Sequence, residues 1–119
     1  MTRNRDTAAE AREFYRTYAI DGNVTVNTGT ARFYPYDNAV LETVNAYVAT
    51  APGGQALNVR VNKNGSSAFT FGFSAGSTSA TSSPNLSFSQ GDYVTVDITQ
   101  IGSAAAGADL RINFTFRKI

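Results

Sequence analysis

From residue 23 onward, hydrophobic and polar residues alternate with a period of two, which is the pattern of β-strands that bury one face. The clearest case is the segment 57–61, where Leu, Val and Val alternate with polar residues. Asn64-Gly65 follows, the dipeptide preferred in two-residue hairpin turns, and then three phenylalanines return at the same period. The sequence therefore predicts a β-hairpin over residues 57–73.

The same alternation predicts further strands near residues 24–27, 30–34, 40–48, 93–99 and 110–117. In the last of these, every second residue from Leu110 to Phe116 is apolar and is expected in the core. Residues 74–87 are nearly all Ser, Thr, Ala and Gly, and we expect a loop with one irregular edge strand there. About seven or eight strands without a second helix indicate an all-β, antiparallel two-sheet sandwich of jelly-roll type, with a closed barrel as the alternative.

The N-terminal segment has a different period. Thr7-Ala8-Ala9-Glu10 matches the capping box that begins many helices, and Asp21-Gly22 supplies a stop. Between them, apolar residues recur at the spacing of one helix face: Ala11, Phe14, Tyr15 and Tyr18. We therefore expect a short helical arm over residues 1–22, followed by a β-sandwich domain over residues 23–119.

A helix of about three turns is marginal alone in water, so the arm needs a surface to lie on. It could fold back on its own sandwich, but docking on a neighbouring subunit or an underlying shell is favoured because the sandwich looks complete without it. Aromatic and arginine side chains dominate the energetics of interfaces. The residues expected at this assembly interface are Arg3, Arg5, Phe14, Tyr15 and Tyr18.

Composition restricts the chemistry of this 119-residue chain. The net charge is +1 without a basic stripe, which gives no support to nucleic-acid binding. Histidine and cysteine are absent, so Ser–His–Asp triads, Cys–His pairs and zinc sites cannot be built. No apolar run approaches the ~20 residues that span a bilayer, and no signal-peptide core follows the first residues. We expect a protein made in a cytosol, with no enzymatic activity, no cofactor and no membrane partner.

Two residue groups are candidates for a binding site. The acids could hold calcium only if loops brought them together, and without EF-hand spacing we favour solvent-facing positions for them; they are Glu42, Asp92, Asp97 and Asp109. Phe33, Tyr34 and Tyr36 flank Pro35 and could stack on a glycan. The favoured interpretation places Phe33 in the core and the two tyrosines at a strand end or subunit boundary, as possible ligand or subunit contacts.

The chain resembles, over residues 29–119, a sandwich domain that recurs in structural proteins of tailed bacteriophages. The segments that carry the resemblance are Ala31–Pro35, Ala46–Gly54, Val59–Gly65, Gly91–Asp97, Gln100–Ser103 and Ala106–Leu110. The resemblance implies a virion component that assembles as a symmetric oligomer, and it brings no catalytic residues. Residues 1–28 lie outside it.

Together these observations predict a bacteriophage virion structural protein, synthesised in the host cytoplasm. The favoured role is a capsid decoration or cement subunit, a homotrimer that docks on major capsid or tail proteins by its N-terminal arm. The alternative is a tail appendage or fibre-tip module that recognises a host cell-surface glycan. Decoration is favoured because a fibre tip normally follows a long shaft, whereas only a short segment precedes this sandwich.

Overall fold

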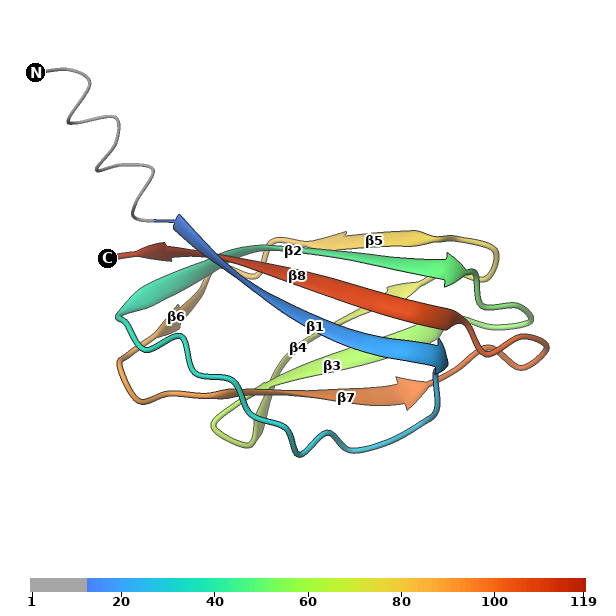
Figure 1. The fold of residues 1–119 in the computed structure, drawn as a ribbon, viewed down its shortest axis with the longest axis horizontal. Coiled ribbons are helices and arrows are strands. Elements are labelled where there is room, and N and C mark those ends of the chain that lie inside the picture. The colour runs from blue at the N-terminus through green and yellow to red at the C-terminus, as the bar shows by residue number, and fades with distance from the viewer. Residues whose placement is uncertain (1–12) are drawn as a thin grey trace, which may run out of the picture.

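The computed structural model describes residues 13–119, which form two antiparallel β-sheets packed face to face (Figure 1). Sheet A has five strands in the order β1-β8-β2-β5, with β6 also paired to β2, and sheet B has the order β4-β3-β7. The strands are β1 (Glu13–Asn23), β2 (Ala39–Thr50), β3 (Leu57–Lys63), β4 (Ser66–Phe73), β5 (Ser79–Ser82), β6 (Leu86–Phe88), β7 (Val94–Gln100) and β8 (Ala108–Lys118). The predicted all-β, two-sheet architecture is confirmed, and the described residues contain no helix that could span a membrane.

The core lies between the two sheets and follows the alternation of the strands. Four residues of β8 are completely buried: Leu110, Ile112, Phe114 and Phe116. They face alternate residues of β3 and β7 in sheet B, including Val59, Val61 and Val96. Strand β8 occupies the inside of sheet A, between β1 and β2, so its inner face has apolar neighbours on both sides.

The hairpin predicted over residues 57–73 is confirmed as β3 and β4. Its turn residues Asn64 and Gly65 have φ angles of 54° and 84°, the left-handed conformation that a two-residue turn of this type needs. The segment of small residues that follows forms the short strands β5 and β6, both paired to β2 at the edge of sheet A.

The expected N-terminal helix is wrong for residues 13–22. These residues form most of β1, which pairs with β8 from Glu13 opposite Arg117 onward. Phe14 stacks on Phe116, with ring centroids 5.0 Å apart and an angle of 7° between the planes. The strand is favoured over the helix because β8 offers a complete row of backbone hydrogen-bond partners together with an apolar face. A short helix would bury only one stripe of apolar side chains. Residues 1–12 lie outside the described part of the chain.

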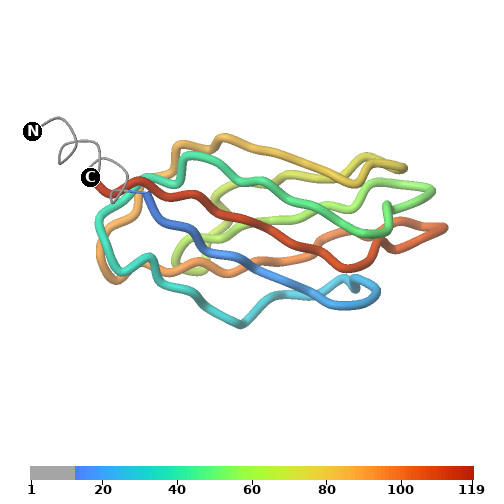
Figure 2. Tube along the Cα trace, turned by 45° about the horizontal axis from the view of Figure 1, so that its top comes forward, coloured from blue at the N-terminus to red at the C-terminus, as the bar shows by residue number. Residues whose placement is uncertain are grey.

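Between β1 and β2, the strands expected near residues 24–27 and 30–34 are not regular. The segment instead runs beside β7 and pairs with it at only two points, Asn27 with Ile98 and Phe33 with Val94 (Figure 2). Five residues of the segment, 28–32, therefore face three residues of β7, and the chain bulges between the two pairings. The segment covers the edge of sheet B that β7 would otherwise expose.

Candidate functional site

The outer face of sheet B carries a group of polar side chains that lie close together. Because Val59 and Val61 of β3 point into the core, Arg60 and Asn62 project from the opposite face. Strand β7 pairs with β3 so that Arg60 lies opposite Asp97 and Asn62 lies opposite Thr95. Asn62 and Asp97 are only 6% and 3% exposed, although they lie outside the apolar core.

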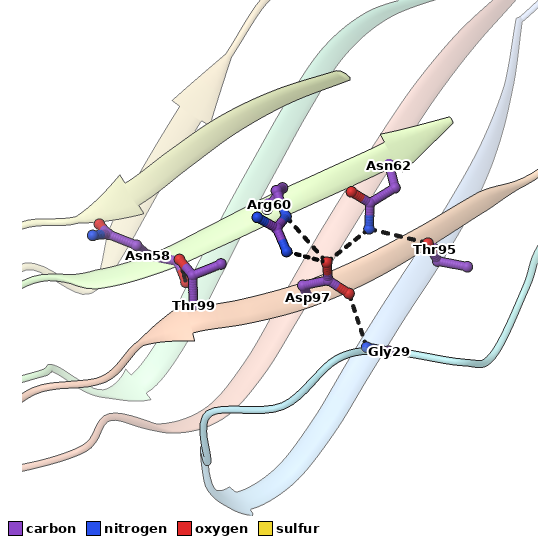
Figure 3. A network of polar contacts seen from close by, with 7 residues as sticks. All are labelled: Gly29, Asn58, Arg60, Asn62, Thr95, Asp97 and Thr99. Atoms are coloured by element: carbon purple, nitrogen blue, oxygen red, sulfur yellow. Dashed lines mark hydrogen bonds and ion pairs between the residues drawn. The ribbon is translucent and has the colours of Figure 1, made fainter. Parts of the chain in front are cut away.

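Asp97 is at the centre of this group (Figure 3). Its Oδ1 accepts a hydrogen bond of 2.9 Å from the backbone N–H of Gly29, in the segment beside β7. Its Oδ2 accepts hydrogen bonds from Nε and Nη2 of Arg60, at 3.1 and 3.0 Å, and from Nδ2 of Asn62 at 2.9 Å. Asn62 also donates to Oγ1 of Thr95 at 3.1 Å. Both carboxylate oxygens are therefore satisfied within the protein.

The network keeps Asp97 ionised. Burial alone would raise the pKa of Asp97, but the hydrogen bonds from Asn62, Gly29 and Arg60 outweigh it and lower the pKa below its ordinary value. Arg60 is fixed by two of its nitrogens, yet its side chain is 41% exposed. The carboxylate therefore holds in place a guanidinium group that solvent or a ligand can reach.

A hollow of about 480 Å³ opens over this network. Its walls combine backbone, hydroxyl, guanidinium and aromatic groups from four parts of the chain. The lining residues with polar or aromatic side chains include Thr28, Thr30, Arg32, Arg60, Ser67, Tyr93, Thr95 and Asp97. Ligand sites of proteins have volumes in the range of about 300–1,000 Å³, so the hollow has room for a small polar molecule.

Aromatic side chains continue from the hollow to the surface. The guanidinium of Arg32 lies 4.1 Å from the ring centroid of Tyr93, a cation–π contact in the wall. Tyr34 follows, with its ring 5.8 Å from Tyr93, and Tyr36 lies 5.6 Å beyond Tyr34. Hydrogen bonding to Tyr34 raises the pKa of Arg32 above its ordinary value. The three tyrosines form a row of rings that begins at the hollow.

The outermost ring of this row sits on an unusual backbone. Tyr36 has a φ angle of 66°, in the left-handed region that bulky residues rarely adopt, and 65% of the residue is exposed. Such a conformation costs on the order of 1–3 kcal/mol and is found mainly at functional sites. The turn after the buried Pro35 thus holds Tyr36 beside Tyr34, although the exposed ring of Tyr36 gains little stabilisation from burial.

The aromatic residues singled out in the sequence fall into two places. Phe33 is turned inward and packs on Phe114 and Phe116, at centroid distances of 5.1 and 6.4 Å, while Tyr34 and Tyr36 stay outside. In β1, Phe14 and Tyr18 pack against the hydrophobic core of the sandwich. Tyr15 lies on the opposite face of the strand and is 63% exposed. Arg3 and Arg5 lie outside the described residues.

The candidate acids are not brought together. Asp97 is bound by Arg60, Asp92 lies 3.7 Å from Lys63, and Glu42 lies 3.0 Å from Arg117. Asp109, near the start of β8, accepts a hydrogen bond from the backbone N–H of Gly22. Within residues 13–119, no three acidic side chains gather into a group that could hold a metal ion.

Arg32, Arg60 and Tyr93 line a common hollow that the sequence pattern did not predict. One signal was present, because Arg60 and Asn62 occupy the outward positions of the predicted hairpin and Asp97 occupies an outward position of its own strand. Their meeting depends on the pairing of β3 with β7 and on the segment at Gly29, which no local pattern shows.

Comparison with known proteins shows the fold alone. No protein-family model matches the sequence, and no curated protein matches it.

Among solved structures, the globular domain of the zebrafish complement 1qA protein is 13% identical with a TM-score of 0.58, covering 91% of this chain and 97% of that one. A chain of the cyanophage Pam1 capsid is 18% identical with a TM-score of 0.50, covering 90% and 84%. The Podospora anserina GH26-CBM35 β-(1,4)-mannanase is 13% identical with a TM-score of 0.51, and the match covers 88% of this chain but 28% of the enzyme. The chain is thus similar to jelly-roll-like β-sandwiches, one of them in a phage capsid.

Proposed function

We propose that this chain is a non-enzymatic structural subunit of a bacteriophage virion, a decoration subunit that assembles with copies of itself on the particle. Its similarity to a cyanophage capsid chain extends over most of both chains, so the whole sandwich is comparable. At 18% identity this similarity concerns the fold. The proposal therefore has to be carried by a surface of the molecule.

That surface is the outer face of sheet A. A row of uncharged polar residues crosses four strands at its centre, and two side-chain hydrogen bonds of 3.0 and 3.1 Å lie within the row. The row consists of Thr17, Asn113, Asn45 and Thr81. On the same face Arg111 pairs with Asp21 at one end of the strands, and Arg117 pairs with Glu42 at the other.

Such a face suits contact with another protein. Interface cores are depleted in charged residues and enriched in tyrosine, and Tyr15 and Tyr47 are 63% and 51% exposed on this face. Within residues 13–119 the centre of this face is an uncharged polar row, so covering it would not bury an unpaired charge, which is the costly event in association. We therefore propose docking through this face of sheet A in place of the expected helix. Of the predicted interface residues, Tyr15 remains exposed and available for contact with a partner. The contribution of Arg3 and Arg5 stays a prediction.

The test places a charge in the middle of the face. Asn45→Lys adds a long cation between β8 and β5, and Thr70→Lys adds the same cation to the exposed outer face of sheet B as a matched control. Multi-angle light scattering should show an oligomer, a trimer by expectation, for the wild type and the control and a smaller species for Asn45→Lys. Mass spectrometry of purified virions should detect the wild-type chain. A monomeric wild type that is missing from purified particles would overturn the proposal.

A second candidate function is the recognition of a cell-surface glycan by a tail appendage. The observation that favours it is the row of Tyr93, Tyr34 and Tyr36 beside a polar hollow, because aromatic rings next to hydrogen-bonding groups match the two faces of a sugar. Glycan-array binding that is lost in Tyr34→Ala and Tyr36→Ala, with unfolding temperatures retained, would support this function. Absence of binding by the wild type to any glycan would remove it.

A further inference from the structure

We propose that the hollow on the outer face of sheet B binds a carboxylate-bearing sugar, a hexuronic acid unit of an acidic polysaccharide, through the guanidinium groups of Arg60 and Arg32. This inference rests on the second candidate function, glycan recognition, and specifies the class of glycan. It concerns a different face of the molecule from the one proposed for assembly.

The balance of charge in the hollow favours an anion. Two guanidinium groups, those of Arg32 and Arg60, and one carboxylate, that of Asp97, line it. Asp97 is nearly inaccessible, and both of its oxygens already accept hydrogen bonds from the protein. A ligand therefore meets the two cations and not the acid.

Arg60 is prepared for this role by its partner. Its Nε and Nη2 bind Asp97, which fixes the plane of the guanidinium group and leaves Nη1 without a hydrogen-bond partner among residues 13–119. A flexible arginine loses side-chain entropy when it binds, so a guanidinium held in advance binds a planar carboxylate at lower cost. Asp97 acts here as a positioning residue.

The remaining walls suit the rest of a sugar. Thr28, Thr30 and Ser67 line the hollow, and a hydroxyl group can donate to or accept from sugar hydroxyls. Tyr93 lies in the same lining and begins the row of rings that leads toward Tyr36. The volume of about 480 Å³ accommodates one or two sugar rings.

A phosphate group is the competing anion, since arginine binds phosphate and carboxylate alike. The lining carries one positive charge in excess, two guanidinium groups against the Asp97 carboxylate. A single carboxylate balances that excess, whereas a phosphate monoester with a charge near −2 would leave uncompensated negative charge close to Asp97. The observations therefore favour the singly charged sugar acid.

The experiment compares methyl glucuronide with methyl glucoside, which differ only at the carboxylate, by ligand-observed NMR titration of the full chain. We expect the glucuronide to bind at least tenfold more tightly and to weaken as salt increases. Arg32→Gln, at an exposed side chain, and Arg60→Gln should each weaken glucuronide binding about tenfold, while Arg117→Gln on sheet A serves as a matched control and should change nothing. Because Arg60→Gln also disturbs the Asp97 network, its unfolding temperature is measured in parallel, and Arg32→Gln decides if that variant fails to fold.

Each alternative outcome identifies what fails. Equal binding of both methyl glycosides would overturn the acidic-sugar inference and leave glycan recognition standing. Tighter binding of inorganic phosphate than of glucuronide, with competition between them, would overturn the inference in favour of a phosphate site. Glucuronide binding unaffected by Arg32→Gln would show that the hollow is not the site. If neither methyl glycoside binds and the wild type also binds no neutral or acidic glycan on an array, the inference and the second candidate function fall together.

Discussion

Replacing Asp97 by asparagine tests whether the polar network on sheet B stabilises the fold. The substitution keeps the shape of the side chain and removes its charge. If the amide oxygen stays near the backbone N–H of Gly29, the new amide nitrogen faces Nε and Nη2 of Arg60 and Nδ2 of Asn62, all of which are donors. Turning the amide round only moves the conflict to Gly29. No orientation satisfies the site.

The magnitude follows from the burial of the partners. Hydrogen bonds to a charged group contribute about 1.5–3 kcal/mol each, and breaking a buried ion pair costs about 3–5 kcal/mol. Arg60 is 41% exposed and regains water when Asp97 is neutralised, which limits the loss. We expect Asp97→Asn to lower the free energy of unfolding by about 2–4 kcal/mol, equivalent to a fall in Tm of about 8–16 °C for a domain of this size.

Urea unfolding followed by tyrosine fluorescence measures this loss, since the chain has six tyrosines and no tryptophan. The control is Asp21→Asn, which removes an ion pair of shorter length, 2.7 Å to Arg111, at a side chain that is 85% exposed. Exposed pairs contribute about 0–1 kcal/mol, so the control should be nearly neutral. A loss below about 0.5 kcal/mol for Asp97→Asn, equal to the control, would refute the view that the network stabilises the fold.

The pH dependence of unfolding, compared between the wild type and Asp97→Asn, adds an independent check. The pKa of Asp97 is lowered in the folded protein, so its ionised form stabilises the fold above the ordinary carboxyl pKa, about 4. This stabilisation is lost as the pH falls through the folded-state pKa. The difference in unfolding free energy between wild type and Asp97→Asn should therefore narrow below about pH 4. The lowered pKa of Asp92 acts equally in both proteins and cancels.

Three further substitutions test other contacts. Phe14→Ala should cost about 2–3 kcal/mol in urea unfolding because its half-buried ring stacks on Phe116, and a neutral result would mean that β1 is detached from the sandwich. Gly29→Ala should lower the Tm and cost about 1–3 kcal/mol, since a Cβ at this position would collide with the carbonyl oxygen of Val96; an unchanged Tm would contradict this close approach. Tyr36→Gly should leave the Tm unchanged or raise it, because glycine adopts positive φ without strain, and a large fall would show that the ring stabilises the fold.

The parts of the fold that the sequence predicts are those in which local patterns agree. In the hairpin, Asn64-Gly65 and the alternating residues on both sides specify the same structure, and in β8 every inward position is apolar. The segment 74–87 was predicted as irregular with one edge strand; it contains β5, and β6 begins at its end and runs to Phe88, with both strands paired to β2. Local agreement of this kind needs no knowledge of distant partners.

Strand β1 was misread because its alternation is hidden. Its inward positions include Phe14 and Tyr18 but also the charged Arg16, while the aromatic Tyr15 points outward. The charged Arg16 interrupts the alternation of apolar and polar residues. The outward Tyr15, together with Phe14 and Tyr18, gives the spacing of an apolar helix face although the segment is a strand. Arg16 can occupy an inward position because β1 is an edge strand of sheet A, where a charged side chain can reach solvent and its guanidinium lies 5.0 Å from the ring of Phe14.

The site was beyond local reading for a different reason. Asp97 was expected on the outward face, and it does lie there, but its burial depends on Gly29, 68 residues away in the chain. That contact depends on the irregular segment lying beside β7, where it pairs through Asn27 and Phe33. An outward aspartate on a strand gives no sign of such a cover.

The two outer faces of the sandwich are physically separate, and this separation makes the proposals independent. The face with Asn45 belongs to sheet A, the face with Arg60 belongs to sheet B, and the core lies between them. Substitutions that share no partner and lie more than about 7–10 Å apart have additive effects. Asn45→Lys should therefore change the oligomeric state without weakening glucuronide binding, and Arg32→Gln should do the reverse. If one substitution moved both properties, assembly would complete or cover the hollow, and a single interface on sheet B would explain the data better than two faces with separate roles.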